Sequence, residues 1–115
     1  MVRTAIIVED CAITMQTTKF FLNKLGIKNI LTASNYNEFQ SLLKQNFEPD
    51  LVITDWNIDK NLQGDNVISA ISKFNVPIAV VSSEQEKKTK SSKCKWFKKP
   101  LNISDFTQWL QRVSS

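Results

Sequence analysis

The sequence predicts an α/β fold built on one parallel β-sheet that helices cover on both faces. Short apolar runs alternate along the chain with longer segments whose apolar residues recur at helical spacing. Three of these runs are nearly continuous in Ile, Val and Leu, as expected of strands buried on both faces. No repeat or linker interrupts the alternation, so right-handed crossovers within one domain over residues 1–115 are expected.

Apolar runs mark the expected strands. In chain order these strands are predicted at residues 5–8, 30–33, 51–54, 78–81 and, more weakly, 96–97. The first, third and fourth have the strongest β-branched character. These three are therefore expected to be buried on both faces of the sheet.

Two helices are predicted in the first half of the chain. For the helix over residues 12–25, the side expected to face the sheet comprises Ile13, Thr17, Phe20, Phe21 and Leu25. Gly26 follows as a C-terminal stop. The second helix is predicted from Asn35 with Glu38 three residues later, the pattern of a capping box. Its apolar stripe is Tyr36, Phe39, Leu42 and Leu43.

Two further helices are predicted in the second half. The helix after Gly64 is expected to bury Val67, Ile68, Ile71 and Phe74. Pro77 prevents its continuation and precedes the fourth strand. The last helix is expected to open at Asn102 and to bury Phe106, Trp109, Leu110 and Val113, which recur at helical spacing.

The segment 83–93 departs from this alternation. It reads SEQEKKTKSSK and contains no apolar side chain that a helix would bury against the sheet. A helix there would depend on weak local propensity alone. We therefore expect a loop or a frayed turn in this segment.

Composition excludes several classes of protein. The net charge is +4, and seven lysines lie at positions 87, 88, 90, 93, 95, 98 and 99, whereas arginine occurs only at 3 and 112. A solvated surface segment explains such a run better than a nucleic-acid site, which would bring arginines and interleaved aromatics. No apolar run reaches the ~20 residues of a membrane helix. Cys11 and Cys94 are expected to be reduced thiols in a cytoplasmic protein.

The residues at the predicted strand ends have charged or hydroxyl side chains that could form a ligand-binding site. Ligands of open parallel sheets bind beyond the carboxyl ends of the strands. The side chains there are Glu9, Asp10, Asp55, Ser82 and Lys99. Clustered carboxylates repel one another, and a divalent cation together with a lysine would compensate them.

These residue types suit magnesium-assisted phosphoryl transfer. Mg²⁺ prefers hard oxygen ligands, and the candidates are Glu9, Asp10, Asp55 and the main-chain carbonyl of Asn57. Asp55 is the expected nucleophile, because carboxylates form acyl phosphates. Lys99 would neutralise the incoming group and the Ser82 hydroxyl would donate to a phosphoryl oxygen.

Simpler roles remain open for some of these residues. Glu9 and Asp10 also suit a helix N-terminus, and Asp55 alone would suit a strand-end turn. A shift of one residue in register would exchange Ser82 with Ser83. Between Lys98 and Lys99, the following Pro100 favours Lys99.

Four short motifs at the strand ends resemble those of bacterial response-regulator receiver domains. In order they read IIVED, VITD, VVS and FKKP, and the resemblance covers essentially the whole chain. It implies a flavodoxin-like, doubly wound, five-stranded sheet of order 2-1-3-4-5. It also implies that Asp55 accepts a phosphoryl group from a histidine kinase or histidine phosphotransfer protein.

The resemblance assigns further roles to individual residues. It implies an acidic metal-binding pair at Glu9 and Asp10, and a cis bond between Lys99 and Pro100. Ser82 is implied as the switching hydroxyl and Trp96 as the switching aromatic. Asn57 and Glu84 fall on the two positions that tune the lifetime of the acyl phosphate.

The chain departs from the family pattern at two places. The loop from Asp55 to Gly64 is one residue longer than usual, with Asp59 where proline is common. The stretch between Ser82 and Lys99 is shorter by roughly one helical turn. The fourth helix of the family is therefore expected to be shortened or missing, which alters the face that partners read.

The predicted function is that of a single-domain response regulator. It would catalyse only its own Mg²⁺-dependent phosphorylation and dephosphorylation, and would signal by conformational change and contact with an unknown protein target. One alternative is a receiver-like scaffold that signals without phosphorylation. Another is a phosphatase of the haloacid dehalogenase type, but Asn57 occupies the position where such enzymes place their general acid.

Overall fold

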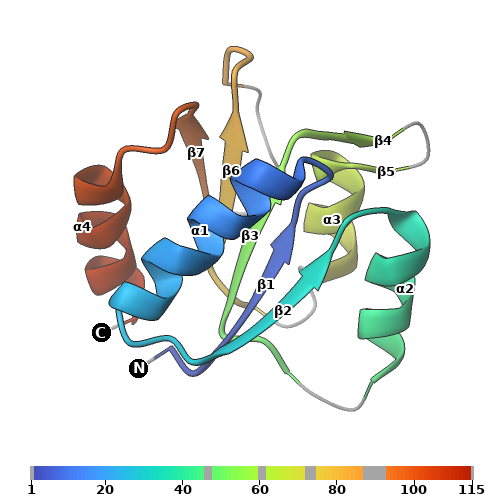
Figure 1. The fold of residues 1–115 in the computed structure, drawn as a ribbon, viewed down its shortest axis with the longest axis horizontal. Coiled ribbons are helices and arrows are strands. Elements are labelled where there is room, and N and C mark those ends of the chain that lie inside the picture. Colours follow the sequence, from blue (N-terminus) through green and yellow to red (C-terminus); the bar gives the residue numbers. More distant parts are fainter. Residues whose placement is uncertain (1, 46–47, 60–61, 72–74, 87–92, 115) are drawn as a thin grey trace.

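Parallel strands form the centre of the fold, with helices on both faces of the sheet (Figure 1). The computed structural model describes residues 2–45, 48–59, 62–71, 75–86 and 93–114. The strands are β1 (Thr4–Val8), β2 (Asn29–Ala33), β3 (Leu51–Asp55), β4 (Asn57–Asp59), β5 (Leu62–Gln63), β6 (Ile78–Ser82) and β7 (Cys94–Lys98). The helices are α1 (Ala12–Lys24), α2 (Tyr36–Lys44), α3 (Gly64–Ile71) and α4 (Ile103–Ser114).

The main sheet has five strands in the order β2-β1-β3-β6-β7, and every neighbouring pair is parallel. Since β6 and β7 are the fourth and fifth strands of this sheet, the predicted order 2-1-3-4-5 is confirmed. All five residues of β3 and of β6 are buried, because these central strands have neighbours on both sides and helices on both faces. The run predicted at residues 96–97 proves to be the middle of a five-residue strand.

Alternate residues of the central strands serve two separate cores. Ile6, Val52 and Val80 point to the face that α2 and α3 cover. Ile7 and Ile53 point to the opposite face, where α1 and α4 pack. The two-residue period of a strand thus divides a nearly continuous apolar sequence between two helical layers.

Helix α1 buries a different face from the predicted one. Its buried residues are Met15, Thr18 and Leu22. Ile13 is 80% exposed and Phe20 is 54% exposed, with the Lys24 ammonium 4.9 Å from the centroid of the Phe20 ring. The prediction was wrong because this helix carries apolar residues on two stripes, and only packing against the sheet selects between them.

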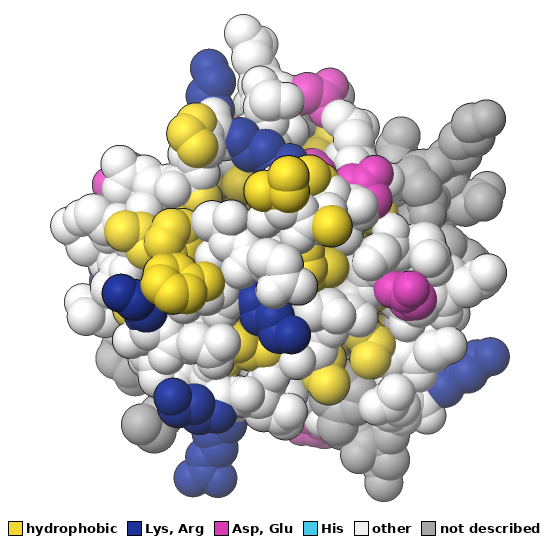
Figure 2. All heavy atoms as spheres, viewed as in Figure 1, with side chains coloured by type: hydrophobic (Ala, Val, Ile, Leu, Met, Phe, Trp, Pro, Cys, Tyr) yellow, Lys and Arg dark blue, Asp and Glu magenta, His cyan; other side chains and the backbone are white. Residues whose placement is uncertain are grey.

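The exposed apolar side chains of α1 lie on the face that Figure 2 presents. Hydrophobic side chains there stand apart from one another among polar groups and lysines or arginines, rather than forming one continuous patch. Leu25, also predicted to be buried, is 37% exposed. Gly26 has φ 91°, a left-handed conformation in which glycine has no steric penalty, so the predicted stop is confirmed.

The other helices follow the predicted patterns. The Glu38 N–H donates to Asn35 Oδ1 at 2.9 Å and the Ser34 N–H donates to Glu38 Oε1 at 2.7 Å, which caps α2. In α4, the Asp105 N–H donates to Asn102 Oδ1 at 3.0 Å. Of the predicted apolar positions in α2, α3 and α4, the buried ones are Phe39, Leu42, Val67, Ile68, Ile71, Phe106, Trp109 and Leu110. Leu43 and Val113 are partly buried, and Phe74 lies outside the described residues.

Two connections bear on the site. After β3 the chain forms a small antiparallel pair, β4 with β5, which the sequence did not predict. After β6, residues 83–86 form neither helix nor strand, as expected. Residues 87–92 lie outside the described part of the chain, so the prediction for the rest of this segment remains untested.

Within the described ranges, no helix is long and apolar enough to cross a lipid bilayer.

Candidate functional site

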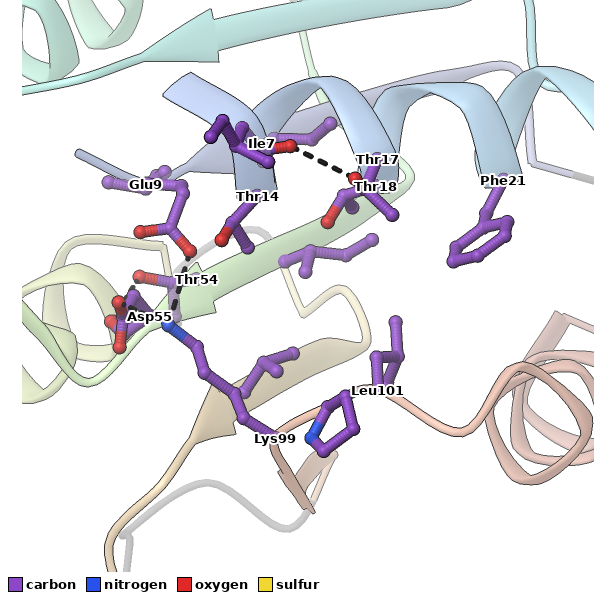
Figure 3. A pocket seen from close by; sticks show the side chains of 15 residues that line it. Ile7, Glu9, Thr14, Thr17, Thr18, Phe21, Thr54, Asp55, Lys99 and Leu101 are labelled. Atoms are coloured by element: carbon purple, nitrogen blue, oxygen red, sulfur yellow. Dashed lines mark hydrogen bonds and ion pairs between the residues drawn. The ribbon is translucent and has the colours of Figure 1, made fainter. Parts of the chain in front are cut away.

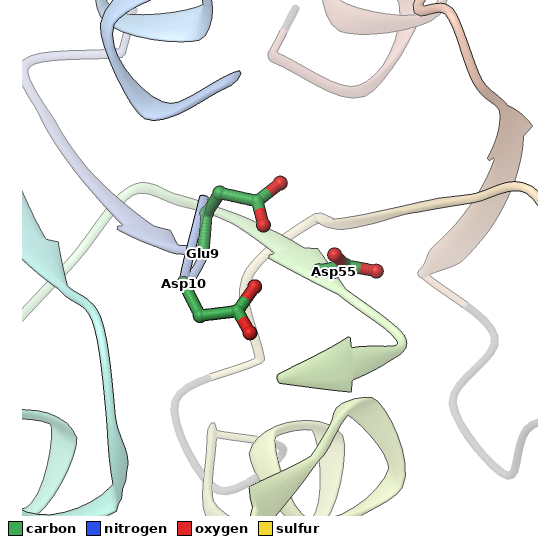
Figure 4. Close-up of side chains that lie close together, drawn as sticks. All are labelled: Glu9, Asp10 and Asp55. Carbon is green, nitrogen blue, oxygen red and sulfur yellow. The ribbon is translucent and has the colours of Figure 1, made fainter. Parts of the chain in front are cut away.

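Three carboxylates from two neighbouring strands meet at one edge of the sheet (Figure 4). Glu9 and Asp10 follow β1, and Asp55 is the last residue of β3. Because Val8 is in register with Thr54, the parallel pairing brings the ends of the two strands together. One oxygen from each carboxylate lies within 4.8 Å of the others. Glu9 and Asp55 are buried, at 5% and 9% exposure, whereas Asp10 is exposed.

Lys99 inserts its ammonium group among these acids. Its Nζ lies 2.9 Å from Asp55 Oδ2 and 3.4 Å from Glu9 Oε1. Its N–H donates to the Ser82 carbonyl at 2.8 Å, and the bond to Pro100 is cis. Burial acts to lower the pKa of Lys99, but the hydrogen bond to Asp55 and the charge of Glu9 outweigh it and raise this pKa. Lys98 is exposed, so the geometry favours Lys99 between the two candidates.

Ser82 ends β6, the next strand beyond β3. It is 1% exposed, while Ser83 is exposed, so Ser82 is the serine that lies inside the fold. The Ser82 Oγ accepts a hydrogen bond from the Glu84 N–H at 3.0 Å. The main chain of Glu84 is thus hydrogen-bonded to Ser82, the residue predicted to provide the switching hydroxyl.

Asn57 and Glu84 are brought together although they are far apart in sequence. The Asn57 side-chain amide donates to Glu84 Oε2. The Asn57 main-chain N–H also donates a hydrogen bond to Asp55 Oδ1, at an N–O distance of 3.3 Å. The two positions assigned to acyl-phosphate lifetime therefore lie together beside the central aspartate.

The half-buried Trp96 packs against Trp56, a residue that the sequence reasoning did not single out. The ring centroids lie 5.1 Å apart at an interplanar angle of 46°. The Trp96 indole N–H donates to the Glu84 carbonyl at 3.3 Å. Trp56 is 8% exposed. The only feature of the sequence that could have marked Trp56 as part of the site is that it directly follows Asp55.

The nearby carboxylates and the burial of the site change the pKa of Glu9. Burial, followed by the negative charge of Asp55, raises the pKa of Glu9 from 4.5 to about 7. A hydrogen bond from the Cys11 N–H to Glu9 Oε2, at 3.2 Å, acts in the opposite direction. Near neutral pH the metal-free site is therefore partly protonated at Glu9.

We expect this shift to make the metal-free protein less stable as pH rises. A carboxyl whose pKa is higher in the folded state stabilises folding below its unfolded pKa of 4.5, and this contribution is lost as pH rises through about 7. The full loss is on the order of 3 kcal/mol, since the pKa rises from 4.5 to about 7 and each pKa unit corresponds to about 1.4 kcal/mol. Urea unfolding in EDTA from about pH 5 to pH 8 measures the effect.

The matched control for this experiment is Glu9→Gln, which cannot titrate but keeps the size of the side chain. Wild type should lose more stability over this pH range than Glu9→Gln. Parallel curves for the two proteins would show that Glu9 does not titrate abnormally.

Solved structures with the same fold are receiver domains. A response regulator receiver protein from Sinorhizobium medicae WSM419 superposes with a TM-score of 0.85, at 18% identity, over 97% of this chain and 94% of that chain. A CheY-like receiver domain from Methylobacillus flagellatus has a TM-score of 0.73, at 18% identity, over 98% and 99% of the two chains. At such identities the likeness shows the fold alone.

A third neighbour is a response regulator protein from Burkholderia pseudomallei, solved with a phosphorylated aspartic acid, a calcium ion and citrate. Its TM-score is 0.78 at 17% identity, over 95% of this chain and 66% of that chain.

No curated protein matches this sequence. Residues 5–108, nearly the whole chain, match the family model described as the response regulator receiver domain. The chain therefore belongs to the response regulator receiver-domain family.

Proposed function

We propose that this protein accepts a phosphoryl group on Asp55 from a histidine kinase or a histidine phosphotransfer protein. One observation carries the proposal: Asp55 is a buried carboxylate at the end of a central strand, 2.9 Å from an ammonium group and beside two further carboxylates. A strand-end turn would not need this environment. Asp55 is thus suited to act as a nucleophile toward a negatively charged phosphoryl group.

The acidic side chains fit a divalent cation. They offer hard oxygen donors, and the Lys99 ammonium pairs with two of the three clustered carboxylates, Glu9 and Asp55. Glu9, Asp10 and Asp55 would hold Mg²⁺, with the Asn57 carbonyl proposed as a further ligand. When bound, the ion supplies positive charge that offsets the carboxylates and the phosphoryl oxygens.

The residues of the chain then have distinct tasks. An Asp55 oxygen forms a bond to phosphorus while the bond to the donor breaks, and the electron pair leaves with the donor. The positive charge of the Lys99 ammonium stabilises the negative charge that develops on the phosphoryl oxygens. The Ser82 hydroxyl would donate to one of these oxygens.

The signal would leave the site through Glu84 and Trp96. To turn toward the phosphoryl group, the Ser82 hydroxyl would give up the hydrogen bond that it accepts from the Glu84 N–H. Glu84 also holds the Trp96 indole through its carbonyl. Movement of Ser82 would therefore release or shift Trp96 against Trp56, and a protein partner would read the change. We further propose that the protein acts in the cytoplasm, where the thiols of Cys11 and Cys94 would stay reduced.

The proposal is tested by incubating the protein with acetyl phosphate and Mg²⁺ and measuring its intact mass. We expect one added phosphoryl group that hydroxylamine removes, as an acyl phosphate requires, and no adduct in EDTA. An adduct that resists hydroxylamine would instead indicate a phosphorylated hydroxyl group, and no adduct at all would refute the proposal.

A second candidate is a receiver-like scaffold that signals without phosphorylation. It is favoured by the segment that follows β6, where residues 83–86 form no helix. A Mg²⁺ titration followed by tryptophan fluorescence separates the two candidates, because Trp56 adjoins Asp55 in sequence. No response at millimolar Mg²⁺ would favour the scaffold.

A further inference from the structure

A cavity of about 480 Å³ begins at the acidic site and continues away from it between α1 and the segment that follows β7 (Figure 3). One wall is formed by α1, including Thr14, Thr17 and Phe21, and Leu101 lies on the opposite wall. Pro100 also lines the cavity. Its volume falls within the range of ~300–1,000 Å³ that is usual for small-molecule sites. The proposed phosphorylation chemistry does not use this space.

The cavity has one polar end and a mostly apolar remainder. Among the described residues that line it, the charged side chains are those of Glu9, Asp55 and Lys99, and all three lie at the same end (Figure 3). The floor includes Ile7, Ile53 and Val81, which belong to the α1 and α4 side of the core.

The threonines of α1 do not make the apolar part a strongly polar wall. The Thr17 hydroxyl donates to the Ile13 carbonyl at 3.0 Å within the helix, so its proton is already used. Thr18 is buried and no buried side-chain oxygen or nitrogen of the described residues lacks a hydrogen-bond partner. Along Thr17 and Thr18, a ligand in this cavity would therefore meet methyl groups rather than unused donors.

With the Mg²⁺ of the proposed function offsetting the carboxylates, this distribution favours an occupant with an apolar body and an anionic head. The head would lie beside the Lys99 ammonium, whose side chain is 29% exposed, and the body would extend toward Phe21 and Leu101. A small acyl phosphate with an apolar acyl chain has this shape and chemistry. This space is a cavity between α1 and the segment that follows β7 rather than a flat surface, so it suits a small molecule.

We propose that this cavity binds the acyl chain of such a phosphodonor, so that the protein reacts faster with apolar acyl phosphates than with acetyl phosphate. The inference rests on the proposed function of Asp55. In the step, an Asp55 oxygen bonds to phosphorus and the bond between phosphorus and the bridging oxygen of the donor breaks. The electron pair stays on that oxygen, which leaves as a carboxylate, and no proton or further reactant is needed.

The test compares second-order rate constants for adduct formation with hexanoyl phosphate and with acetyl phosphate in the same Mg²⁺ buffer. Each methylene moved fully from water to an apolar wall corresponds to about a fourfold gain. For four additional methylenes in a cavity that is open on one side, we expect hexanoyl phosphate to react about tenfold faster. Equal rate constants in wild type would overturn the inference and leave the function of Asp55 intact.

Variants on α1 show whether the preference comes from the cavity. Thr17→Phe fills the space from an exposed position on the helix and should bring the two rate constants toward equality. Phe20→Ala is the matched control, because Phe20 lies on the same helix but does not line the cavity, and it should keep the preference. A preference that survives in Thr17→Phe would overturn the assignment.

A binding measurement separates this inference from the proposed function. The probe is the hexanoyl analogue in which a methylene group replaces the bridging oxygen, so that it cannot transfer its phosphoryl group. Its binding should shift the amide NMR signals of Thr14 and Phe21 in wild type. If neither donor forms an adduct, the proposed function fails, and unshifted signals at these two residues would overturn the cavity as well.

Discussion

Replacing Asp55 with asparagine should abolish the hydroxylamine-sensitive adduct completely. The amide keeps the size of the side chain but has no carboxylate oxygen to attack phosphorus, and an acyl phosphate cannot form on it. Intact mass after incubation with acetyl phosphate and Mg²⁺ measures the loss. The same variant should lower the pKa of Glu9, because the charge of Asp55 is one of the causes that raise it.

The matched control for this variant is Asp105→Asn, the same chemical change at an exposed position in the first turn of α4. It should form the adduct at the wild-type rate. If Asp55→Asn still formed as much adduct as wild type, another carboxylate would be the acceptor, and peptide mapping would test Glu9 and Asp10 first.

Replacing Lys99 with methionine should slow adduct formation by about two orders of magnitude, as does removal of one preorganised charge-stabilising group in other sites. The variant loses the ammonium 2.9 Å from Asp55 and leaves the carboxylates without this compensation. It keeps the nucleophile, so the adduct should still form slowly. The rate constant is measured by quenching the reaction at intervals and recording intact mass.

Lys98→Met is the control for Lys99→Met, because the neighbouring side chain is exposed and should not affect the rate. A second readout is the pH dependence of unfolding. The charge of Lys99 lowers the pKa of Glu9, so its removal should move the titration of Glu9 to higher pH. An unchanged rate in Lys99→Met would refute the role assigned to this lysine.

The strands and the order of the site residues could be predicted because they depend on local pattern and topology. Continuous apolar runs indicated strands buried on both faces, and parallel strands place their carboxyl ends at one edge. Together with the strand order implied by the family, this rule brings Glu9 and Asp55 together from positions 46 residues apart in the sequence. It also places Lys99 beside them, as the ion pairs show.

The buried face of α1 could not be predicted in the same way. Ile13 and Phe20 form as good an apolar stripe as Met15 and Leu22, and only the position of the helix over the sheet decides between them. The pairing of Trp56 with Trp96 was missed for a related reason. This contact joins residues 40 positions apart, and it depends on how the turn after β3 packs against β7, which no local pattern encodes.

The fold class and the side chains at the sheet edge could be predicted from the residues alone, and the strand order followed from the resemblance to receiver domains. Periodicity and chain order suffice for the fold class and the sheet-edge residues, because these follow from the regular geometry of strands and helices. Only the tertiary structure decided the raised pKa of Glu9, the attachment of Glu84 to Ser82 and Trp96, and the cavity beneath α1. Each of these depends on distances and burial between segments that are remote in the chain, and such quantities exist only once the chain has packed.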